Sequence, residues 1–187
     1  MVKTIFHVKL RPLSQGAIVI IILALLTGCQ AKEPHLSQKA AAMVIVVQDT
    51  MAGLSKALAR PVADGDLKEI NFILENQFSG AGVEPRLPVT YAGVTNNQGI
   101  ILTAYPKINS IGSDFSKYGV MVRVLQNKGI HQEKLFIDNY PEIWVICAPL
   151  TNQGRVVGTV WLALDAEKVR TTSKMSTEVF LGINFNK

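Results

Sequence analysis

The stretch that most constrains the fold of this chain is Glu142–Asp165. It contains two apolar runs rich in Val, Ile and Trp, Ile143–Pro149 and Val156–Leu164. The polar residues Thr151–Gly154 separate the runs, and a turn of this composition between two β-prone segments predicts an antiparallel hairpin. Apolar and polar residues do not alternate cleanly along either run. We therefore expect both faces of the hairpin to be covered, with the hairpin inside a sheet and not at its edge.

Residues 1–28 have the three parts of a secretory signal sequence. Lys3, Lys9 and Arg11 form a basic region, and Ala17–Leu26 is an uninterrupted apolar stretch ending at small residues. The alternative, a transmembrane anchor, would need about 20 apolar residues, and this stretch is much shorter. We therefore expect residues 1–28 to direct export and to be removed.

The residues that follow indicate which kind of signal this is. Leu26-Thr27-Gly28-Cys29 resembles the lipobox of bacterial lipoproteins. The resemblance implies diacylglyceryl transfer to Cys29, cleavage after Gly28 and acylation of the new amino terminus. Several acyl chains make a stable membrane anchor. Gln30 lacks the Asp linked to inner-membrane retention, so the resemblance implies an outer-membrane lipoprotein facing the periplasm, with residues 29–35 as a lipidated tether.

The charge of the chain changes when the signal sequence is removed. The full sequence has 19 basic and 14 acidic residues, a net charge of +5. Removal of Lys3, Lys9 and Arg11 leaves 16 basic against 14 acidic residues, or +2. Such a small excess gives no electrostatic reason to expect nucleic-acid binding. The hydrophobic content of 48% and charged content of 18% predict a globular domain, which we place at residues 36–187.

Cysteine and histidine usage excludes several kinds of site. If Cys29 is lipidated, Cys147 is the one remaining thiol, and its place inside an apolar run predicts a buried, inert side chain. The sequence has no CxxC or haem-attachment motif, and His35 and His131 are far apart. It also lacks a G-x-S-x-G elbow, a glycine-rich phosphate loop and an H-E-x-x-H motif. We expect no metal, no cofactor and no enzymatic activity.

Two helices are predicted before the first strand. Apolar residues spaced by three and four from Leu36 to Leu58 predict a long helix that ends before Pro61. Its segment Met43–Val47 is apolar nearly all round. This predicts either a fully intramolecular contact or a homodimer formed through the outer side of the helix. Asp66 is a suitable N-cap for a second helix, Leu67–Phe78.

The rest of the chain predicts strands around a long connection. Val89–Thr95 and Gly99–Tyr105 form a first hairpin. The connection Pro106–Tyr140 is expected to contain a helix capped by Ser113 or Asp114 and ending near Asn127, then a short strand, Lys134–Ile137. This order predicts an α+β fold in which the two N-terminal helices pack on a central antiparallel sheet, with the helices on one side.

Three stretches then suggest a family. They are Tyr91–Asn96 with Gly99–Leu102, Ile111–Ser116, and Ala148–Leu150 with Val157–Val160. Together they resemble a single Cache domain, the PAS-like extracytoplasmic sensor module of bacterial chemoreceptors and histidine kinases, over about residues 36–185. The resemblance implies a pocket between the sheet and the loop after the first hairpin, with a small carboxylate or amino acid as the ligand.

Typical Cache proteins continue into a transmembrane helix and a cytoplasmic signalling domain. The sequence has no such hydrophobic span between the predicted domain and Lys187. We therefore expect any signal to pass through a separate membrane partner.

Five residues are candidates for contacting a ligand. Arg123 can donate two parallel hydrogen bonds to a carboxylate, although it could equally point to solvent between buried neighbours. Tyr118 and Tyr105 are of the type that lines small pockets. His131 belongs to the same polar connection, where we expect a solvated surface residue, with ligand contact as the alternative. Trp144, like Trp161, is expected in the core, with a pocket wall as the alternative.

The leading hypothesis is a lipid-anchored, periplasm-facing Cache-like module that binds a small molecule and signals through a separate partner. The alternative is an envelope lipoprotein that keeps the fold without a small-ligand site and contacts another protein through the long helix or the sheet.

Overall fold

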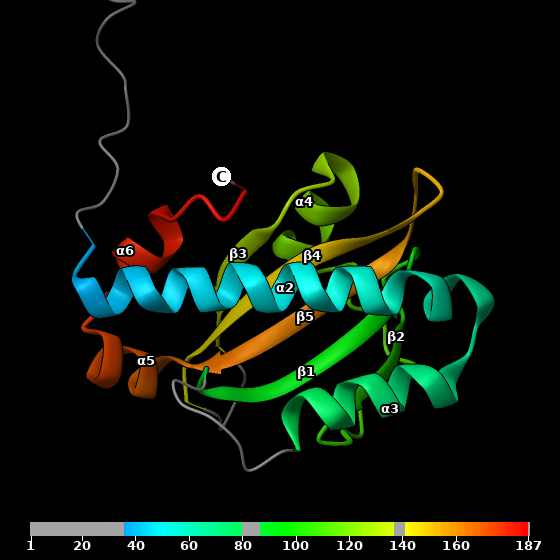
Figure 1. The fold of residues 1–187 in the computed structure, drawn as a ribbon, viewed down its shortest axis with the longest axis horizontal. Coiled ribbons are helices and arrows are strands. Elements are labelled where there is room, and N and C mark those ends of the chain that lie inside the picture. Colours follow the sequence, from blue (N-terminus) through cyan, green and yellow to red (C-terminus); the bar gives the residue numbers. More distant parts are fainter. Residues whose placement is uncertain (1–35, 80–86, 137–140, 187) are drawn as a thin grey trace, which may run out of the picture. The chain divides into compact units, whose positions relative to one another are not determined.

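A computed structural model describes residues 36–79, 87–136 and 141–186 (Figure 1). The signal sequence, Cys29 and the tether lie outside these residues, so those assignments stay predictions. The helices and strands, in chain order, are α2 (Gln38–Asp64), α3 (Leu67–Phe78), β1 (Val89–Asn96), β2 (Ile101–Tyr105), α4 (Gly119–Asn127), β3 (His131–Leu135), β4 (Ile143–Asn152), β5 (Arg155–Asp165), α5 (Ala166–Ser173) and α6 (Thr177–Gly182).

The strands form one antiparallel sheet in the order β2-β1-β5-β4-β3. The hairpin predicted in Glu142–Asp165 is confirmed as an interior pair, because β5 lies between β1 and β4, and β4 lies between β5 and β3. Trp144 and Ile146 of β4 belong to one apolar cluster, whereas Val145 and Cys147 belong to another. Both faces are therefore buried, which explains the missing alternation, and the α+β fold is confirmed.

The first hairpin is also present, with a turn held by one side chain. The Oδ1 atom of Asn96 accepts hydrogen bonds from the backbone N–H groups of Gln98 and Ile100, both at 2.9 Å. Gly99 has φ +83°, a conformation that glycine adopts without steric cost. β2 begins at Ile101, slightly later than predicted, and Ile100 before it forms an isolated β-bridge with Asp114.

Helix α2 begins two residues after the predicted start at Leu36 and extends further than the sequence suggests. Ser37 caps its start by accepting a hydrogen bond from the N–H of Ala40 at 3.1 Å. The predicted end before Pro61 is wrong, since the helix continues through Pro61 to Asp64. Burial of Val62 and a C-cap at Gly65, whose φ is +70°, hold the last turn in place despite the missing proline N–H.

By length and composition alone, α2 could also cross a membrane. Its buried stripe argues against that reading, because Val47, Met51, Leu54 and Leu58 are all at most 3% exposed in the core. A helix packed this way along one side is a core helix of a globular domain.

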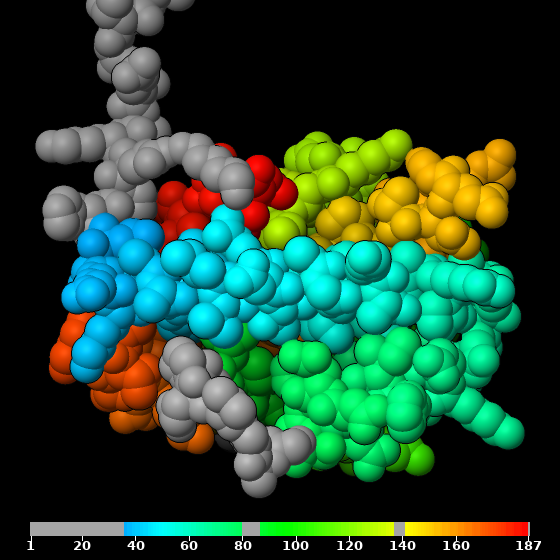
Figure 2. Space-filling model, viewed as in Figure 1, coloured from blue at the N-terminus to red at the C-terminus, as the bar shows by residue number. Residues whose placement is uncertain are grey.

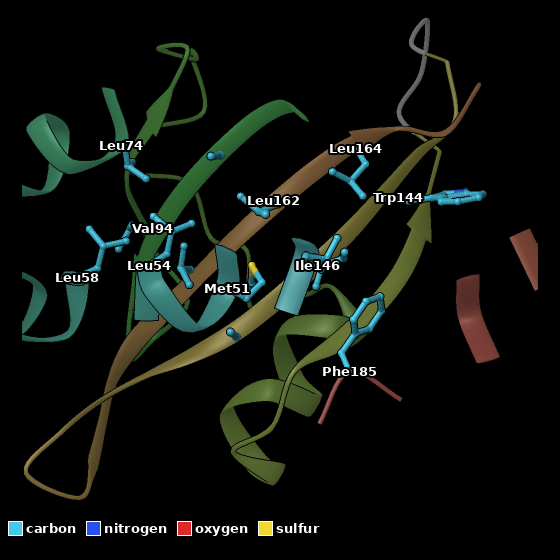
Figure 3. Close-up of a cluster of buried hydrophobic side chains, with 14 of the residues drawn as sticks. Met51, Leu54, Leu58, Leu74, Val94, Trp144, Ile146, Leu162, Leu164 and Phe185 are labelled. Carbon is cyan, nitrogen blue, oxygen red and sulfur yellow. The ribbon is translucent and has the colours of Figure 1, made fainter. Parts of the chain in front are cut away.

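The larger apolar cluster lies between the sheet and α2. Figure 3 shows Met51, Leu54 and Leu58 of α2 beside Val94, Ile146 and Leu162 of the sheet. Ile70 and Leu74 attach α3 to the same cluster. Figure 2 shows α2 running across this face of the molecule with α3 beside it. The prediction that the two N-terminal helices pack on the sheet is confirmed.

The C-terminal residues complete the same cluster. Phe180, Ile183 and Phe185 are at most 8% exposed, and the ring of Phe180 stacks on Trp144 with centroids 4.4 Å apart. From β3, the side-chain amide of Gln132 donates to the carbonyl oxygen of Ile183 at 2.6 Å. The apolar residues of Phe180–Phe185 are thus part of the core.

Helix α4 corrects two predictions. It lies against the opposite face of the sheet, where Val120, Met121 and Val124 pack in the smaller apolar cluster, so the helices are not all on one side. It also begins at Gly119 with Tyr118 as N-cap, and not after Ser113 or Asp114. Asp114 instead accepts a hydrogen bond from the N–H of Ser116 at 2.7 Å, which closes a tight turn before the helix.

The third strand lies earlier than predicted. β3 runs over His131–Leu135, whereas the sequence suggested Lys134–Ile137, of which Ile137 lies outside the described residues. The strand is an edge strand and its side chains are mostly polar, so it gives little apolar signal. The expected solvated position of His131 is wrong as well, because the strand pairs His131 with Cys147 and half-buries its side chain.

Candidate functional site

The candidate site is the sheet face that α4 covers, called here the α4 face. One cross-strand row organises it, because His131 pairs with Cys147, Cys147 with Trp161, and Trp161 with Gly93. Residues paired directly across an antiparallel sheet point to the same face. Trp161 and Cys147 belong to the cluster beneath α4, so His131 is on the α4 face too.

Gly93 allows the Trp161 indole to lie flat across β1. A Cβ atom at Gly93 would lie 2.3 Å from Cζ2 of Trp161, closer than side-chain atoms can approach. Above the indole, the Phe115 ring centroid is 5.6 Å away, and Tyr118 is 4.6 Å from Phe115. The loop before α4 and strand β5 therefore form an aromatic layer on this face.

Two nitrogen atoms on this face lack a hydrogen-bond partner among the described residues. They are Nε1 of Trp161 and Nε2 of His131, and both atoms are buried. By contrast, Nε1 of Trp144 donates to Glu142 at 2.7 Å on the other face. A buried polar group without a partner costs about 1–3 kcal/mol, so such groups commonly mark a place for a water molecule or ligand.

A charged pair lies beside the row. Nη2 of Arg123 is 3.5 Å from Oε2 of Glu133 and donates to the carbonyl oxygen of Gln132 at 3.1 Å. Glu133 also accepts a hydrogen bond from the N–H of Val120 at 2.6 Å, in the first turn of α4. The negative charge of Glu133 suits the positive end of the helix. The side chain of Arg123 is 42% exposed, and its guanidinium keeps N–H groups for another acceptor.

The surroundings change the protonation of two groups in the row. Burial, and then the charge of Arg123, lower the pKa of His131, which favours the neutral imidazole. Burial strongly raises the pKa of Cys147, whose side chain is fully buried. Cys147 is therefore an inert thiol and not a nucleophile, as its sequence context predicted.

The lowered pKa of His131 predicts a pH dependence of stability. In the unfolded chain the imidazole of His131 binds a proton at about pH 6.5, whereas in the folded chain it stays neutral at that pH. The free energy of unfolding should therefore fall as the pH is lowered from about 7 to about 5.5. A His131→Gln variant should lose less stability over this range. Urea denaturation at both pH values measures the difference. Carboxylates with a lowered pKa, such as Glu142, titrate below this window. Equal losses of stability in the parent protein and the variant would contradict the attribution of this pH dependence to His131.

The structure brings together three of the five predicted site residues. Tyr118, Arg123 and His131 all lie on the α4 face. Trp144 is fully buried on the opposite face against Phe180, and Tyr105 packs beside the α2-side cluster. The ligand contacts themselves stay predictions.

Two residues of the site were not among the sequence candidates for ligand contact. Trp161 was expected in the core or in a pocket wall, and Glu133 was not considered. Strand pairing is the signal that could have found Trp161. Trp144 and Cys147 are separated by an odd number of residues along β4, so they point to opposite faces of the sheet. Trp161 pairs with Cys147 and therefore lies on the α4 face. No sequence signal marks Glu133, whose role depends on where α4 begins.

A cavity of about 400 Å³ lies elsewhere, between α3 and the edge strand β2, and Tyr105 lines it. Its other lining residues are Asn71, Glu75, Leu102, Thr103, Ala104, Lys107 and Ile111. The described residues contain no group of three or more His, Cys, Asp or Glu side chains that could hold a metal ion.

Comparison with known proteins places this fold. No family model matches the sequence, and no curated protein matches it. Solved structures do match. The ligand-binding domain of the Pseudomonas aeruginosa PAO1 amino acid chemoreceptor PctC, in complex with GABA, is 18% identical with a TM-score of 0.54, covering 70% of this chain and 56% of that chain. The chain shares the fold of this ligand-binding domain.

Two further chemoreceptor ligand-binding domains share this fold. That of Pseudomonas fluorescens CtaA, in complex with L-leucine, is 13% identical with a TM-score of 0.57, covering 84% of this chain and 64% of that chain. That of P. aeruginosa PctB, in complex with L-Arg, is 14% identical with a TM-score of 0.55, covering 72% and 55%. This chain thus spans less than two thirds of the length of these receptor domains. At such identities the likeness concerns the fold.

Proposed function

We propose that this chain is a lipid-anchored Cache-like module that faces the periplasm and binds a small carboxylate or amino acid on the α4 face. A separate membrane protein receives the signal. The observation that carries the proposal is the pair of buried, unpartnered nitrogen atoms of Trp161 and His131 in one cross-strand row. A carboxylate oxygen is a suitable acceptor for the indole N–H, and Arg123 beside the row supplies a positive charge.

The structural neighbours support the same class of ligand. PctC, CtaA and PctB were solved with GABA, L-leucine and L-Arg bound, all of which carry a carboxylate and an amino group. On the α4 face, Arg123 would attract the carboxylate, and the free oxygen of Glu133 would attract the ammonium. Tyr118 and Phe115 would cover the ligand with aromatic surface.

The proposal predicts a ligand that raises the melting temperature. The full-length chain in detergent would be screened by tryptophan fluorescence against GABA, L-leucine, L-Arg, L-serine, L-alanine and L-isoleucine. A ligand at 100 times its Kd adds about 2.7 kcal/mol, or about 5 °C for a chain of this size. Trp161→Phe removes the unpartnered N–H and should reduce the shift strongly.

Trp144→Phe is the matched control. It removes an indole N–H on the opposite face, so it should lower the starting melting temperature but keep the ligand-induced shift. A panel without any shift would contradict the proposal, and so would an equal shift in Trp161→Phe. The first of these results would favour the alternative function, a protein-interaction module.

One observation favours that alternative. On the outer side of α2, Ile45 is 58% exposed, and Ala42 and Ala52 are exposed as well. An uncovered apolar helix side of this kind suits another protein or a second copy of the chain.

The lipid anchor rests on the sequence Leu26–Cys29. The proposal predicts that the protein purified from membranes begins at Cys29 and carries acyl chains. Intact-mass measurement tests this directly. A mass equal to that of the unprocessed chain would contradict the anchor without affecting the ligand site.

A further inference from the structure

The cavity between α3 and β2 is lined by two charged residues that form no ion pair within the part of the chain that the structure describes. Glu75 on α3 and Lys107, two residues after β2, both line it. Both side chains are exposed, and neither forms an ion pair with another described residue. The lining of one cavity therefore includes an acidic and a basic residue, from α3 and from the loop after β2.

The wall between the charges is partly polar and partly apolar. Oγ1 of Thr103 donates to Oδ1 of Asn71, which fixes the amide of Asn71 and leaves its N–H₂ group as a donor. Leu102, Tyr105 and Ile111 supply apolar surface. A ligand that fits this wall needs a short apolar body with a polar group at each end.

The charged residues of the cavity are separate from those of the α4 face. Helix α3 packs through Ile70 and Leu74 into the cluster on the α2 side of the sheet. The row of Trp161, Cys147 and His131 lies on the other side, beneath α4. The two sites therefore share no charged residue.

We propose that this cavity is a second binding site, for a small zwitterion such as a free amino acid or a dipeptide. The ammonium group of the ligand pairs with Glu75, and its carboxylate pairs with Lys107 and the amide of Asn71. A volume of about 400 Å³ is within the range of small-ligand pockets and suits a molecule of this size.

The test is calorimetric titration of the full-length chain in detergent with L-alanine and with L-alanyl-L-alanine. N-acetyl-L-alanyl-L-alanine amide, which lacks both charges, is the ligand control. We expect one of the two zwitterions to bind and the blocked peptide not to bind. Whichever zwitterion binds more tightly identifies the ligand as an amino acid or a dipeptide.

Variants assign the site. Glu75→Gln and Lys107→Met should each weaken binding about tenfold, because each removes one charge-assisted contact. Glu69→Gln, on the same helix outside the cavity, should bind like the parent chain. Both cavity side chains are exposed, so the variants should unfold at the parent temperature. Binding of neither zwitterion, or equal binding of the blocked peptide, would overturn the proposal.

The Trp161→Phe variant distinguishes binding in this cavity from binding on the α4 face. It should leave zwitterion binding in the cavity unchanged, whatever its effect on a ligand of the α4 face. Zwitterion binding that is lost in Trp161→Phe and kept in Glu75→Gln would assign the ligand to the α4 face and overturn the second site.

Discussion

Replacing Gly158 by alanine is expected to destabilise the protein by about 3 kcal/mol, at the upper end for overpacking a core. A Cβ atom at this position of β5 would lie 2.1 Å from the carbonyl oxygen of Thr95 and 3.1 Å from a methyl group of Val62. The first neighbour is backbone of the paired strand, and the second belongs to the last turn of α2. Neither can move without disturbing the sheet or the helix that crosses it. Thermal unfolding should show a fall of at least about 6 °C.

Gly53→Ala is the matched control. Gly53 lies inside α2, and apart from its chain neighbours and the nearby backbone of its own helix no atom lies within 4 Å of the place where a Cβ would sit. Alanine is a better helix residue than glycine, so this variant should be more stable than the parent by about 0.5–1 kcal/mol. If Gly158→Ala left the melting temperature unchanged, the close approach of β5 to β1 would be wrong.

Replacing Phe180 by alanine should have a comparable or larger effect. The side chain is 1% exposed and stacks on Trp144, and its ring centroid lies 6.2 Å from that of Phe185. Loss of a buried phenylalanine costs about 3–5 kcal/mol, because apolar contact is lost and a cavity remains. Urea denaturation of the full-length chain measures the change.

Leu181→Ala controls for the effect of altering α6. This neighbouring side chain is 40% exposed, so its removal should cost less than about 1 kcal/mol. Similar losses in both variants would mean that the C-terminal helix does not dock through Phe180, and that the last residues lie outside the core.

The interior of the fold was predictable because its signals are redundant. In Glu142–Asp165, long apolar runs, β-branched residues and a polar turn all favour the same buried hairpin. The long helix was predictable from its apolar period, even though Val44–Val47 locally favours a strand. Here burial of the periodic face outweighs local preference.

The boundaries were less predictable, since they depend on tertiary contacts. Pro61 normally ends a helix, but here buried Val62 and the cap at Gly65 keep the last turn helical. Asp114 has the composition of an N-cap, yet its carboxylate is used by a turn before α4. A single sequence does not distinguish these uses, because the same hydrogen-bonding groups serve both.

The candidate site was predictable in its location but not in its geometry. The loop after the first hairpin does supply Tyr118 and Arg123 to one face of the sheet. Which strand residues meet them depends on register, since moving a strand by one residue turns every side chain to the other face. That dependence explains why the sequence did not distinguish Trp144 from Trp161, and why only Trp144 was named among the candidates for ligand contact.

The most direct test of ligand binding on the α4 face uses the two tryptophans as reporters. In a ¹⁵N-labelled sample of the full-length chain in detergent, each indole N–H gives one signal, and Trp161→Phe assigns them. With a ligand from the amino-acid panel, the Trp161 signal should shift, because its free N–H gains an acceptor. The Trp144 signal should stay in place, because Glu142 already accepts its hydrogen bond. An unchanged Trp161 signal across the whole panel would contradict a ligand site on the α4 face.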